Sequence, residues 1–330
     1  MNPFSLLVKP VGGTCNLNCD YCFYKEHRGG KMSVETMDQL FSSYAALPFP
    51  AKAIALQGGE PLLAWDTGIF QRLAAFPVDK SLQTNATLVT KEIAETLKRD
   101  NWLVGASLDG PRELNRLRGD SYEAIVAGIR RLEQADVAYN LLSVVSQANV
   151  RHPREVYRFL RDNFQTNFLQ FIECTGPRDE IDGESWGDFL IGVFDEWIKE
   201  DARKVSIRLF DSIVSQMVLG RPTQCSFDRT CRQYLVIEHD GSVYPCDFHV
   251  REDLRLGNIH THTFRELVDS PLYARFAAAK TENLPKACRE CPYLSFCNGD
   301  CPRNHGLLCA GWKRFFAHAL PQFEELVQDL

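Results

Sequence analysis

The sequence predicts an α/β fold in which a parallel sheet is followed by a smaller, cysteine-rich α+β region. Short apolar runs alternate with amphipathic stretches until about residue 175, and eleven of the twelve cysteines fall in two groups, at 15–22 and 225–309. Strands that alternate with helices form parallel βαβ units with right-handed crossovers. The sheet is then either open and doubly wound or closed on itself like a barrel.

The first half of the chain alternates six predicted strands with five predicted helices. Apolar runs rich in β-branched residues predict strands at 5–9, 53–57, 80–85, 102–108, 139–146 and 168–173. Helical periodicity predicts helices at 33–46, 66–76, 90–100, 121–135 and 153–163.

Polar motifs follow these strands. The first cysteine group follows the first strand, "GGEP" (58–61) the second, "TNAT" (84–87) the third and "SLDGP" (107–111) the fourth, while Glu173 closes the sixth. The carboxyl ends of barrel strands are the face where α/β barrels place their active sites. We therefore expect the chemistry at this edge. No GxGxxG or Walker pattern is present, which disfavours a dinucleotide fold.

The second half has a different pattern. A helical stretch at 184–200 and "VSIRLF" at 205–210 lead into it, and "YLVIEHDGSVYPC" predicts a β-hairpin that turns at Asp240-Gly241. Two further helices are predicted at 264–279 and 312–328. We expect a division into residues 1–200 and 201–330.

Composition excludes several classes of protein. Of the 330 residues 45% are hydrophobic, the net charge is -6, and there is no basic block of the kind that binds nucleic acid. No apolar run approaches the roughly 18–20 residues of a membrane span. We expect a soluble, cytoplasmic protein, and in a reducing cytosol clustered cysteines indicate metal ligands before disulfides. Cys174 stands apart and is expected to be a small buried hydrophobe.

The first cysteine group places Cys15, Cys19 and Cys22 in a C-x₃-C-x₂-C run. With His27 these thiols offer a Cys₃His zinc site. Alternatively, they supply three of the four ligands of a [4Fe–4S] cluster and leave one iron open for a reacting molecule.

This run, with Tyr21 before its last cysteine, resembles the signature of radical S-adenosylmethionine (SAM) enzymes. The resemblance implies a SAM molecule on the open iron. "QGGEP" is similar to the glycine-rich motif of that family, in which Gly58 and Gly59 allow close backbone approach and Glu60 adds a polar group near the SAM ammonium.

The second cysteine group resembles the SPASM domain, which carries auxiliary clusters, so the fold implied is a partial (β/α)₆ barrel followed by a SPASM domain. The resemblance implies two auxiliary [4Fe–4S] clusters that transfer electrons, one held by Cys225, Cys231, Cys246 and Cys301 and one by Cys288, Cys291, Cys297 and Cys309. By spacing alone, two Cys₄ zinc sites stay open as an alternative.

Longer strings, among them "SLLVKP", "CNLNCDYCFY", "LQGGEPLL" and "GSVYPCDFH", resemble the anaerobic sulfatase-maturating enzymes. This resemblance implies oxidation of a sulfatase Cys or Ser to Cα-formylglycine, with a 5′-deoxyadenosyl radical taking a Cβ hydrogen and Asp247 accepting a proton. Otherwise Asp247 is a solvated turn carboxylate. The alternative functions are a SPASM-type maturase that crosslinks a ribosomal peptide and a redox carrier.

The same resemblance implies further contacts and partners. The SAM contacts are Tyr21, Gly58, Gly59, Glu60, Ser107, Arg118 (with Arg116 as a competitor) and Leu169, which otherwise is plain strand core. The substrate contacts are Tyr24, Gln57 and Arg208. The implied partners are an unfolded sulfatase segment and an electron donor such as flavodoxin or ferredoxin.

Overall fold

The computed structural model describes residues 4–45, 52–176 and 178–328. Within these ranges ten strands form one sheet in the order β10-β9-β8-β1-β2-β3-β4-β5-β6-β7. The strands are β1 (Phe4–Val8), β2 (Lys52–Leu56), β3 (Asp79–Thr84), β4 (Trp102–Ser107), β5 (Tyr139–Val145), β6 (Phe168–Glu173), β7 (Ser206–Ile207), β8 (Tyr234–Ile237), β9 (Ser242–Tyr244) and β10 (Gly257–Asn258).

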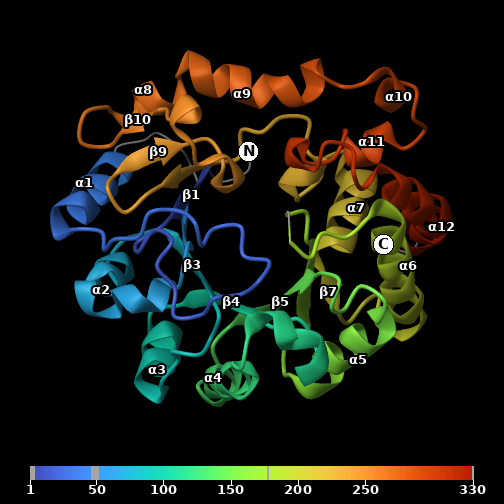
Figure 1. Cartoon of the computed structure of the whole chain (residues 1–330), viewed down its shortest axis with the longest axis horizontal. Helices are drawn as coiled ribbons and strands as arrows, with labels where there is room; N and C mark the ends of the chain where they lie inside the picture. The colour runs from blue at the N-terminus through green and yellow to red at the C-terminus, as the bar shows by residue number, and fades with distance from the viewer. Residues whose placement is uncertain (1–3, 46–51, 177, 329–330) are drawn as a thin grey trace.

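Helices α1–α6 lie around the outside of the curved sheet (Figure 1). The α-helices are α1 (Val34–Ala45), α2 (Ile69–Ala74), α3 (Lys91–Arg99), α4 (Tyr122–Gln134), α5 (Pro153–Asn163), α6 (Gly183–Glu200), α7 (Arg208–Leu219), α8 (Phe264–Val268), α9 (Pro271–Glu282), α10 (Lys286–Arg289), α11 (Leu294–Cys297) and α12 (Cys309–Gln328). Short 3₁₀ turns include η1 (Pro61–Thr67), η2 (Arg112–Arg118) and η4 (Asp247–His249). No helix in the described ranges is long and apolar enough to cross a membrane.

The predicted fold class is confirmed: strands β1–β7 run parallel, and each of the six predicted strands is present within a residue or two. The predicted helix at 66–76 was wrong in detail, because Gly68 adopts a φ of 87° and separates η1 from α2. The predicted helix at 264–279 is two helices, and the second begins at Pro271. Helix α7 had not been predicted; it follows directly on β7.

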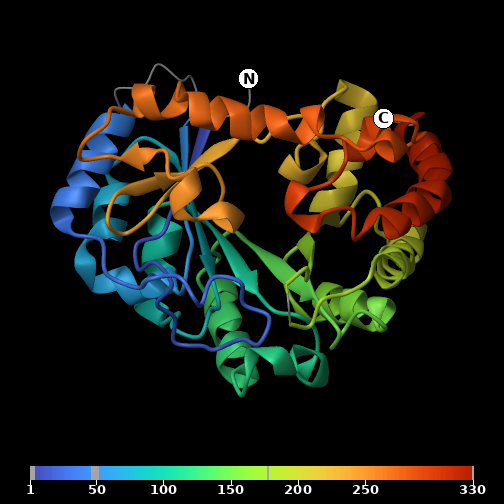
Figure 2. The same ribbon diagram turned by 45° about the horizontal axis from the view of Figure 1, so that its top comes forward.

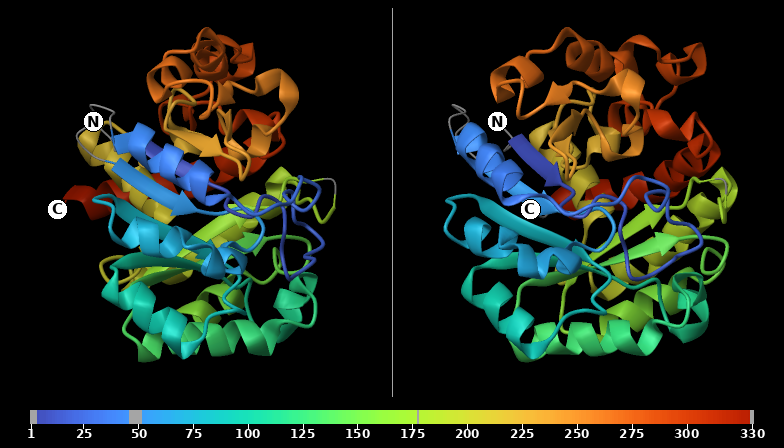
Figure 3. Two further views of the ribbon diagram at one scale, coloured as in Figure 1. Left: turned by 90° about the vertical axis from the view of Figure 1, so that its left-hand side faces the viewer. Right: turned by 60° about the vertical axis from the view of Figure 1, so that its left-hand side comes forward.

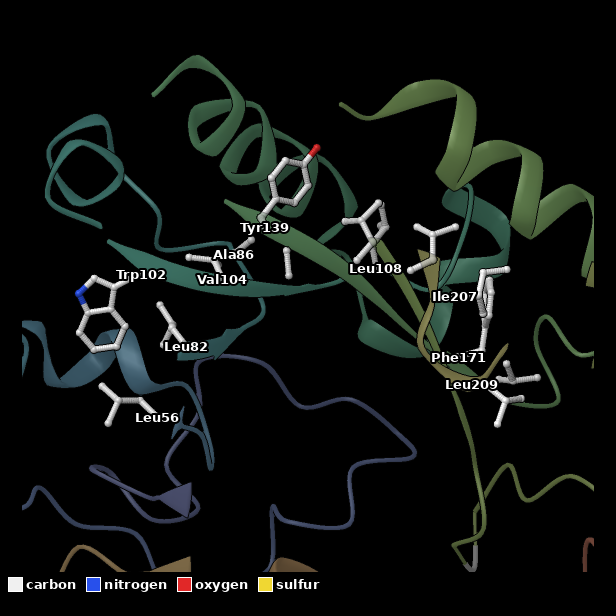
Figure 4. Close-up of a cluster of buried hydrophobic side chains, with 14 of the residues drawn as sticks. Leu56, Leu82, Ala86, Trp102, Val104, Leu108, Tyr139, Phe171, Ile207 and Leu209 are labelled. Atoms are coloured by element: carbon white, nitrogen blue, oxygen red, sulfur yellow. The ribbon is translucent and has the colours of Figure 1, made fainter. Parts of the chain in front are cut away.

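The core lies between the sheet and its surrounding helices. Figure 4 shows how neighbouring strands contribute one apolar side chain after another to this layer. The side chains from β2 to β7 that it labels include Leu56, Leu82, Val104, Tyr139, Phe171 and Ile207, all at most 6% exposed. Burying such residues removes apolar area from water and is the main force that holds the helices against the sheet.

The cysteine-rich region is built onto the same sheet. Strand β8 pairs in parallel with β1, so Leu6 lies opposite Leu235, and the predicted hairpin is confirmed by antiparallel β9. Helices α8 and α9 then cross above this edge (Figures 2 and 3). The sheet is continuous across residue 200, and the expected division there stays a prediction.

The last helix fastens the cysteine-rich region to the other end of the barrel. Helices α6 and α12 cross at glycines, and a Cβ atom on Gly311 would lie 1.9 Å from the carbonyl oxygen of Gly183. An aromatic cluster covers the crossing, in which the ring centroids of Phe194 and Phe323 are 4.9 Å apart. The cysteine-rich region is therefore held at both edges of the sheet.

Candidate active site

The first cysteine loop, residues 9–33, follows β1 and contains no helix or strand. Cys15, Cys19 and Cys22 carry free, part-buried thiols. The Cys15 sulfur accepts hydrogen bonds from the Leu17 amide at 3.4 Å and from Asn85 Nδ2 at 3.7 Å. Such N–H···S contacts favour a thiolate and are typical of iron–sulfur ligands.

The glycine-rich motif, residues 58–61, is hydrogen-bonded to this loop through the backbone. The Gly59 amide donates to the Gly12 carbonyl at 2.7 Å, and the Glu60 amide donates to the Thr14 carbonyl at 2.9 Å. A Cβ atom on Gly59 would lie only 1.8 Å from the Thr14 oxygen. The close backbone approach that glycine permits therefore joins the two loops to each other.

Glu60 is fully buried and its carboxylate is used inside the protein. It accepts hydrogen bonds from Leu62 N at 3.1 Å, Thr84 Oγ1 at 2.8 Å and Asn85 N at 2.8 Å. Burial raises the pKa of Glu60 to about 7, against these hydrogen bonds, which lower it. The side chain thus ties the loop after β2 to the loop after β3, which also carries the Asn85 contact to Cys15.

A second buried carboxylate, Asp109, follows β4. Arg118 donates to it from Nε and Nη2, both at 2.9 Å, and Tyr21 donates its hydroxyl at 2.5 Å. The amide of Val144 completes the set at 2.9 Å. The competing Arg116 is exposed and donates to the carbonyl of Glu113. Asp109 therefore holds Arg118 beside Tyr21 through Nε and Nη2, and Nη1 takes no part in the ion pair with Asp109.

The remaining predicted SAM contacts lie on neighbouring strands. Ser107 ends β4, and its hydroxyl accepts from Gln83 Nε2 at 3.0 Å. Leu169 lies opposite Leu141 in the sheet and is 2% exposed.

Asp247 begins η4 directly after Cys246 and is 8% exposed. Tyr234 donates its hydroxyl to Asp247 Oδ1 at 3.1 Å, and Lys9 Nζ lies 3.7 Å from Oδ2. This environment differs from that of a solvated turn carboxylate, because the group is buried next to a cation. Burial lowers the pKa of Lys9, and the charges of Asp247 and Glu238 oppose that shift.

The first cysteine loop and the Asp247 turn are in contact through two aromatic rings. The ring centroids of Phe23 and Phe248 are 4.5 Å apart, which places the neighbour of Cys22 against the neighbour of Asp247. Tyr24 donates its hydroxyl to Glu238, and Lys9 Nζ lies 4.4 Å above the Tyr24 ring.

The other two predicted substrate contacts follow β2 and β7. Gln57 follows β2, and its amide donates to the Val8 carbonyl at 2.9 Å. Arg208 begins α7 and donates from Nη1 to Gln170 Oε1 at 3.3 Å. Its charge also acts on the thiol of Cys225.

The later cysteines lie in two groups. Charge interactions connect Cys225 with Cys231 and Cys301, and Cys301 with Cys246. Others connect Cys288 with Cys291 and Cys309, and Cys297 with Cys288 and Cys291. Burial raises the pKa of Cys301 to about 12 and that of Cys297 to about 11.

These thiols suit metal clusters chemically. Buried neighbouring thiolates repel one another, and a cationic cluster relieves that repulsion when it takes them as ligands. In the described residues no three His, Cys, Asp or Glu side chains converge on one ion. The His27 ring lies tilted against Tyr24, with the ring centroids 4.3 Å apart.

Four functional candidates were missed by the sequence analysis: Lys9, Asp109, Tyr234 and Glu238. Lys9 and Glu238 follow the apolar strands β1 and β8, and a charged residue at the carboxyl end of a buried strand was a usable signal. Asp109 lies within the "SLDGP" motif. Tyr234 gave no signal, because an aromatic residue is ordinary in a strand.

Comparisons with known proteins agree with this geometry. Residues 10–160 match the model of the radical SAM superfamily, and residues 225–292 match that of an iron–sulfur cluster-binding domain, SPASM. A serine-type anaerobic sulfatase-maturating enzyme of Bacteroides thetaiotaomicron is 30% identical, with 99% of this chain and 92% of the relative covered. A cysteine-type enzyme of Clostridium perfringens is 31% identical, with both chains covered completely.

Solved structures give the same result. The structure of native anSMEcpe with bound AdoMet and Cp18Cys peptide superposes with a TM-score of 0.92 at 30% identity, covering 99% of each chain. The structure of SuiB from Streptococcus suis, bound to its precursor peptide SuiA, has a TM-score of 0.69 at 17% identity, over 92% of this chain and 72% of that one. The second likeness shows a shared fold.

Proposed function

This chain belongs to the anaerobic sulfatase-maturating enzymes of the radical SAM superfamily, and we propose that it oxidises a cysteine or serine of a sulfatase to Cα-formylglycine. The observation that supports this most directly is the junction of two loops. Phe23 and Phe248 join the first cysteine loop to the turn of Asp247. A radical source and a proton acceptor on one substrate are what this oxidation needs.

Three [4Fe–4S] clusters fit the cysteines. We assign the SAM-binding cluster to Cys15, Cys19 and Cys22. We assign one auxiliary cluster to Cys225, Cys231, Cys246 and Cys301, and the other to Cys288, Cys291, Cys297 and Cys309. When bound, SAM and the first cluster supply the 5′-deoxyadenosyl radical that removes a Cβ hydrogen from the substrate.

The SAM contacts divide into direct and supporting residues. Arg118 has Nη1 available for the SAM carboxylate, since Nε and Nη2 are held by Asp109. We assign further direct SAM contacts to Tyr21, Gly58, Gly59, Ser107 and Leu169. For Glu60 we assign a supporting role, because its oxygens accept from three groups of the protein.

Asp247 is assigned the proton transfer. The substrate loses a hydrogen atom from Cβ, then a proton from its thiol or hydroxyl, and one electron, which goes to an auxiliary cluster. A serine becomes the aldehyde directly, whereas a cysteine gives a thioaldehyde that water converts to the aldehyde with release of hydrogen sulfide. A general base must lie within hydrogen-bond reach of the proton it takes, and Asp247 lies at the junction that faces the substrate.

The proposed partners follow from this chemistry. A sulfatase segment must be unfolded to bring one Cβ into the mouth, where Tyr24, Gln57 and Arg208 are the proposed contacts. The electron that starts SAM cleavage comes from a carrier of the flavodoxin or ferredoxin class. Free thiols throughout the described chain are consistent with a reducing compartment, the cytoplasm.

The test is isotope transfer from a peptide with a sulfatase-type C/S-x-P/A-x-R pattern. With the peptide deuterated at Cβ of its Cys or Ser, deuterium should appear in 5′-deoxyadenosine and an aldehyde should be trapped by a hydrazine. With the α-deuterated peptide as control, no label should move. Label from Cα, or a crosslinked product without aldehyde, would assign the chain to peptide crosslinking instead.

A further inference from the structure

Lys9 is a buried lysine beside Asp247, and it has no role in the function described above. It follows β1, and its side chain is 2% exposed. Its stem passes across the glycine-rich loop, where a Cβ atom on Gly58 would lie 3.2 Å from Lys9 Cδ. Gly58, with a φ of 122°, leaves the space through which Lys9 reaches the interior.

The ammonium of Lys9 lies among acidic and aromatic groups. Asp247 Oδ2 is 3.7 Å away, and the Tyr24 ring centroid is 4.4 Å away. Glu238 is engaged by the Tyr24 hydroxyl on the far side. A charge this deeply buried is costly unless a partner compensates it, and Asp247 is the partner within ion-pair distance.

The two oxygens of Asp247 have different partners. Lys9 faces Oδ2, and the Tyr234 hydroxyl faces Oδ1 at 3.1 Å. The same hydroxyl lies 3.3 Å from the Cys246 sulfur. Lys9 and Tyr234 together form a cradle around the Asp247 carboxylate. Tyr234 also contacts the proposed cluster ligand Cys246, whereas Lys9 also contacts the glycine-rich loop.

We propose that Lys9 is a positioning residue that holds the Asp247 carboxylate toward the substrate, so that hydrogen abstraction is followed by proton removal. The proposal rests on the proposed function. The stem of Lys9 passes beside Gly58 in the glycine-rich loop, and its ammonium group lies beside the proposed base, Asp247. Misplacing a reacting group by about 1 Å can lower a rate by roughly 10²-fold, so losing one side of the cradle should affect the proton step.

The experiment compares Lys9→Met with Lys9→Arg in the anaerobically reconstituted enzyme. The measured quantity is aldehyde formed per 5′-deoxyadenosine formed. For Lys9→Met we expect SAM cleavage within about twofold of wild type and a ratio reduced by roughly 10- to 10²-fold. Lys9→Arg keeps the positive charge and should recover much of the ratio.

Two further variants separate positioning from general effects. Lys31→Met removes an exposed lysine of the same loop, whose ion-pair partner is Asp66, and we expect a ratio close to wild type. Tyr234→Phe removes the hydroxyl beside Cys246, so it should shift the reduction potential of an auxiliary cluster, read by electron paramagnetic resonance. Lys9→Met should leave that potential unchanged.

Each outcome decides the matter. An unchanged ratio in Lys9→Met overturns the proposal. It is also overturned by an equal loss in Lys9→Met and Lys9→Arg, which indicates a packing role, or by an equal loss in Lys9→Met and Lys31→Met, which indicates a general effect. If Lys9→Met does not load its clusters, Lys9→Gln takes its place under the same criteria. If the wild-type enzyme forms no aldehyde, the proposed function fails first, and this inference fails with it.

Discussion

The two sides of the mouth use their buried carboxylates differently. On the SAM side, Glu60 and Asp109 are 0% and 1% exposed, and each accepts from at least three groups of the protein. On the base side, Asp247 is 8% exposed; it accepts hydrogen bonds from the Tyr234 hydroxyl and the Cys246 thiol, and Lys9 Nζ lies 3.7 Å away. When Cys246 binds a cluster as a thiolate it no longer donates to Asp247, and Asp247 then keeps acceptor capacity for a substrate proton.

The difference in hydrogen bonding separates carboxylates with a structural role, Glu60 and Asp109, from the proposed base, Asp247. A carboxylate that is saturated by internal donors fixes loops in place and is a poor base, because its lone pairs are occupied. A carboxylate held by a lysine and a tyrosine beside a cluster ligand keeps a defined orientation and can still accept. The SAM side therefore needs rigidity, and the base side needs a free oxygen.

The largest effect is expected on the SAM side, when its metal ligands are removed. Wild-type protein should contain about twelve irons per chain, in three four-iron clusters. Changing Cys15, Cys19 and Cys22 together to Ala should remove about four irons and abolish SAM cleavage, because no ligands remain for the first cluster. Iron and sulfide analysis and a 5′-deoxyadenosine assay measure both.

Cys174→Ala is the matched control, since this buried thiol lies outside the three ligand groups. It should keep the wild-type iron content and SAM cleavage. Zinc in place of iron at the later eight cysteines, after anaerobic preparation, would contradict the cluster assignment.

On the base side, Asp247→Asn should separate the two steps of the reaction. The amide keeps the shape of the side chain but cannot take a proton, so aldehyde formation should fall by about 10²-fold or more. SAM cleavage should continue, because the saturated carboxylates of the other side are unchanged. The measurement is the yield of aldehyde and of 5′-deoxyadenosine in one reaction.

Asp240→Asn is the control for this variant. Asp240 lies in the turn of the same hairpin and accepts from the Ser242 amide at 2.9 Å. It should leave both yields unchanged. Wild-type aldehyde yields from Asp247→Asn would exclude the role of base.

The two sides also differ in how far the sequence predicts them. The strands, the cysteine runs and "GGEP" were visible, because period-two patterns and cysteine spacing depend on local chemistry. The contact of Lys9 and Tyr234 with one carboxylate was not visible, since it depends on a pairing of β1 with β8 that joins residues more than two hundred positions apart. Long-range strand pairing leaves no local signal, and the base-side cradle depends on it.

The roles of Glu60 and Arg118 show the same limit. The motif places Glu60 near SAM, but three donors from two later loops use its carboxylate. Arg118 is expected to bind SAM, and the sequence did not show that its Nε and Nη2 are held by Asp109, which leaves Nη1 for SAM. In both cases the residue type and the approximate place were predictable, whereas the partner was set by tertiary structure.

A third prediction concerns stability on the SAM side. Asp109→Asn leaves the buried Arg118 without its counter-charge, and breaking a buried ion pair from one side costs about 3–5 kcal/mol. Denaturant unfolding of the reconstituted protein measures the change. Glu95→Gln breaks the exposed pair with Lys91 and should cost less than about 0.5 kcal/mol. Equal losses in the two variants would contradict the internal role of Asp109.

The smallest expected effect concerns Glu60. Glu60→Gln replaces an acceptor with an N–H group that faces donors, so stability should fall by about 1–3 kcal/mol at pH 5. The folded-state pKa of about 7 lies above the usual carboxyl value. The stability due to this raised pKa is complete below the unfolded pKa of about 4.3 and is lost as the pH rises through 7. The gap between wild type and Glu60→Gln should therefore narrow between pH 5 and pH 8.

The control for this pH dependence has the opposite sign. Glu266 caps α8 through Thr263, and these hydrogen bonds lower the pKa of its carboxyl group. Its contribution is present above the unfolded pKa and is lost as the pH falls. The stability gap between wild type and Glu266→Gln should therefore widen as the pH rises from 3 to 6 and then stay constant. If the Glu60→Gln gap also widened with pH, the buried carboxylate of the SAM side would be an ordinary ionised acceptor, and its contrast with Asp247 would rest on hydrogen bonds alone.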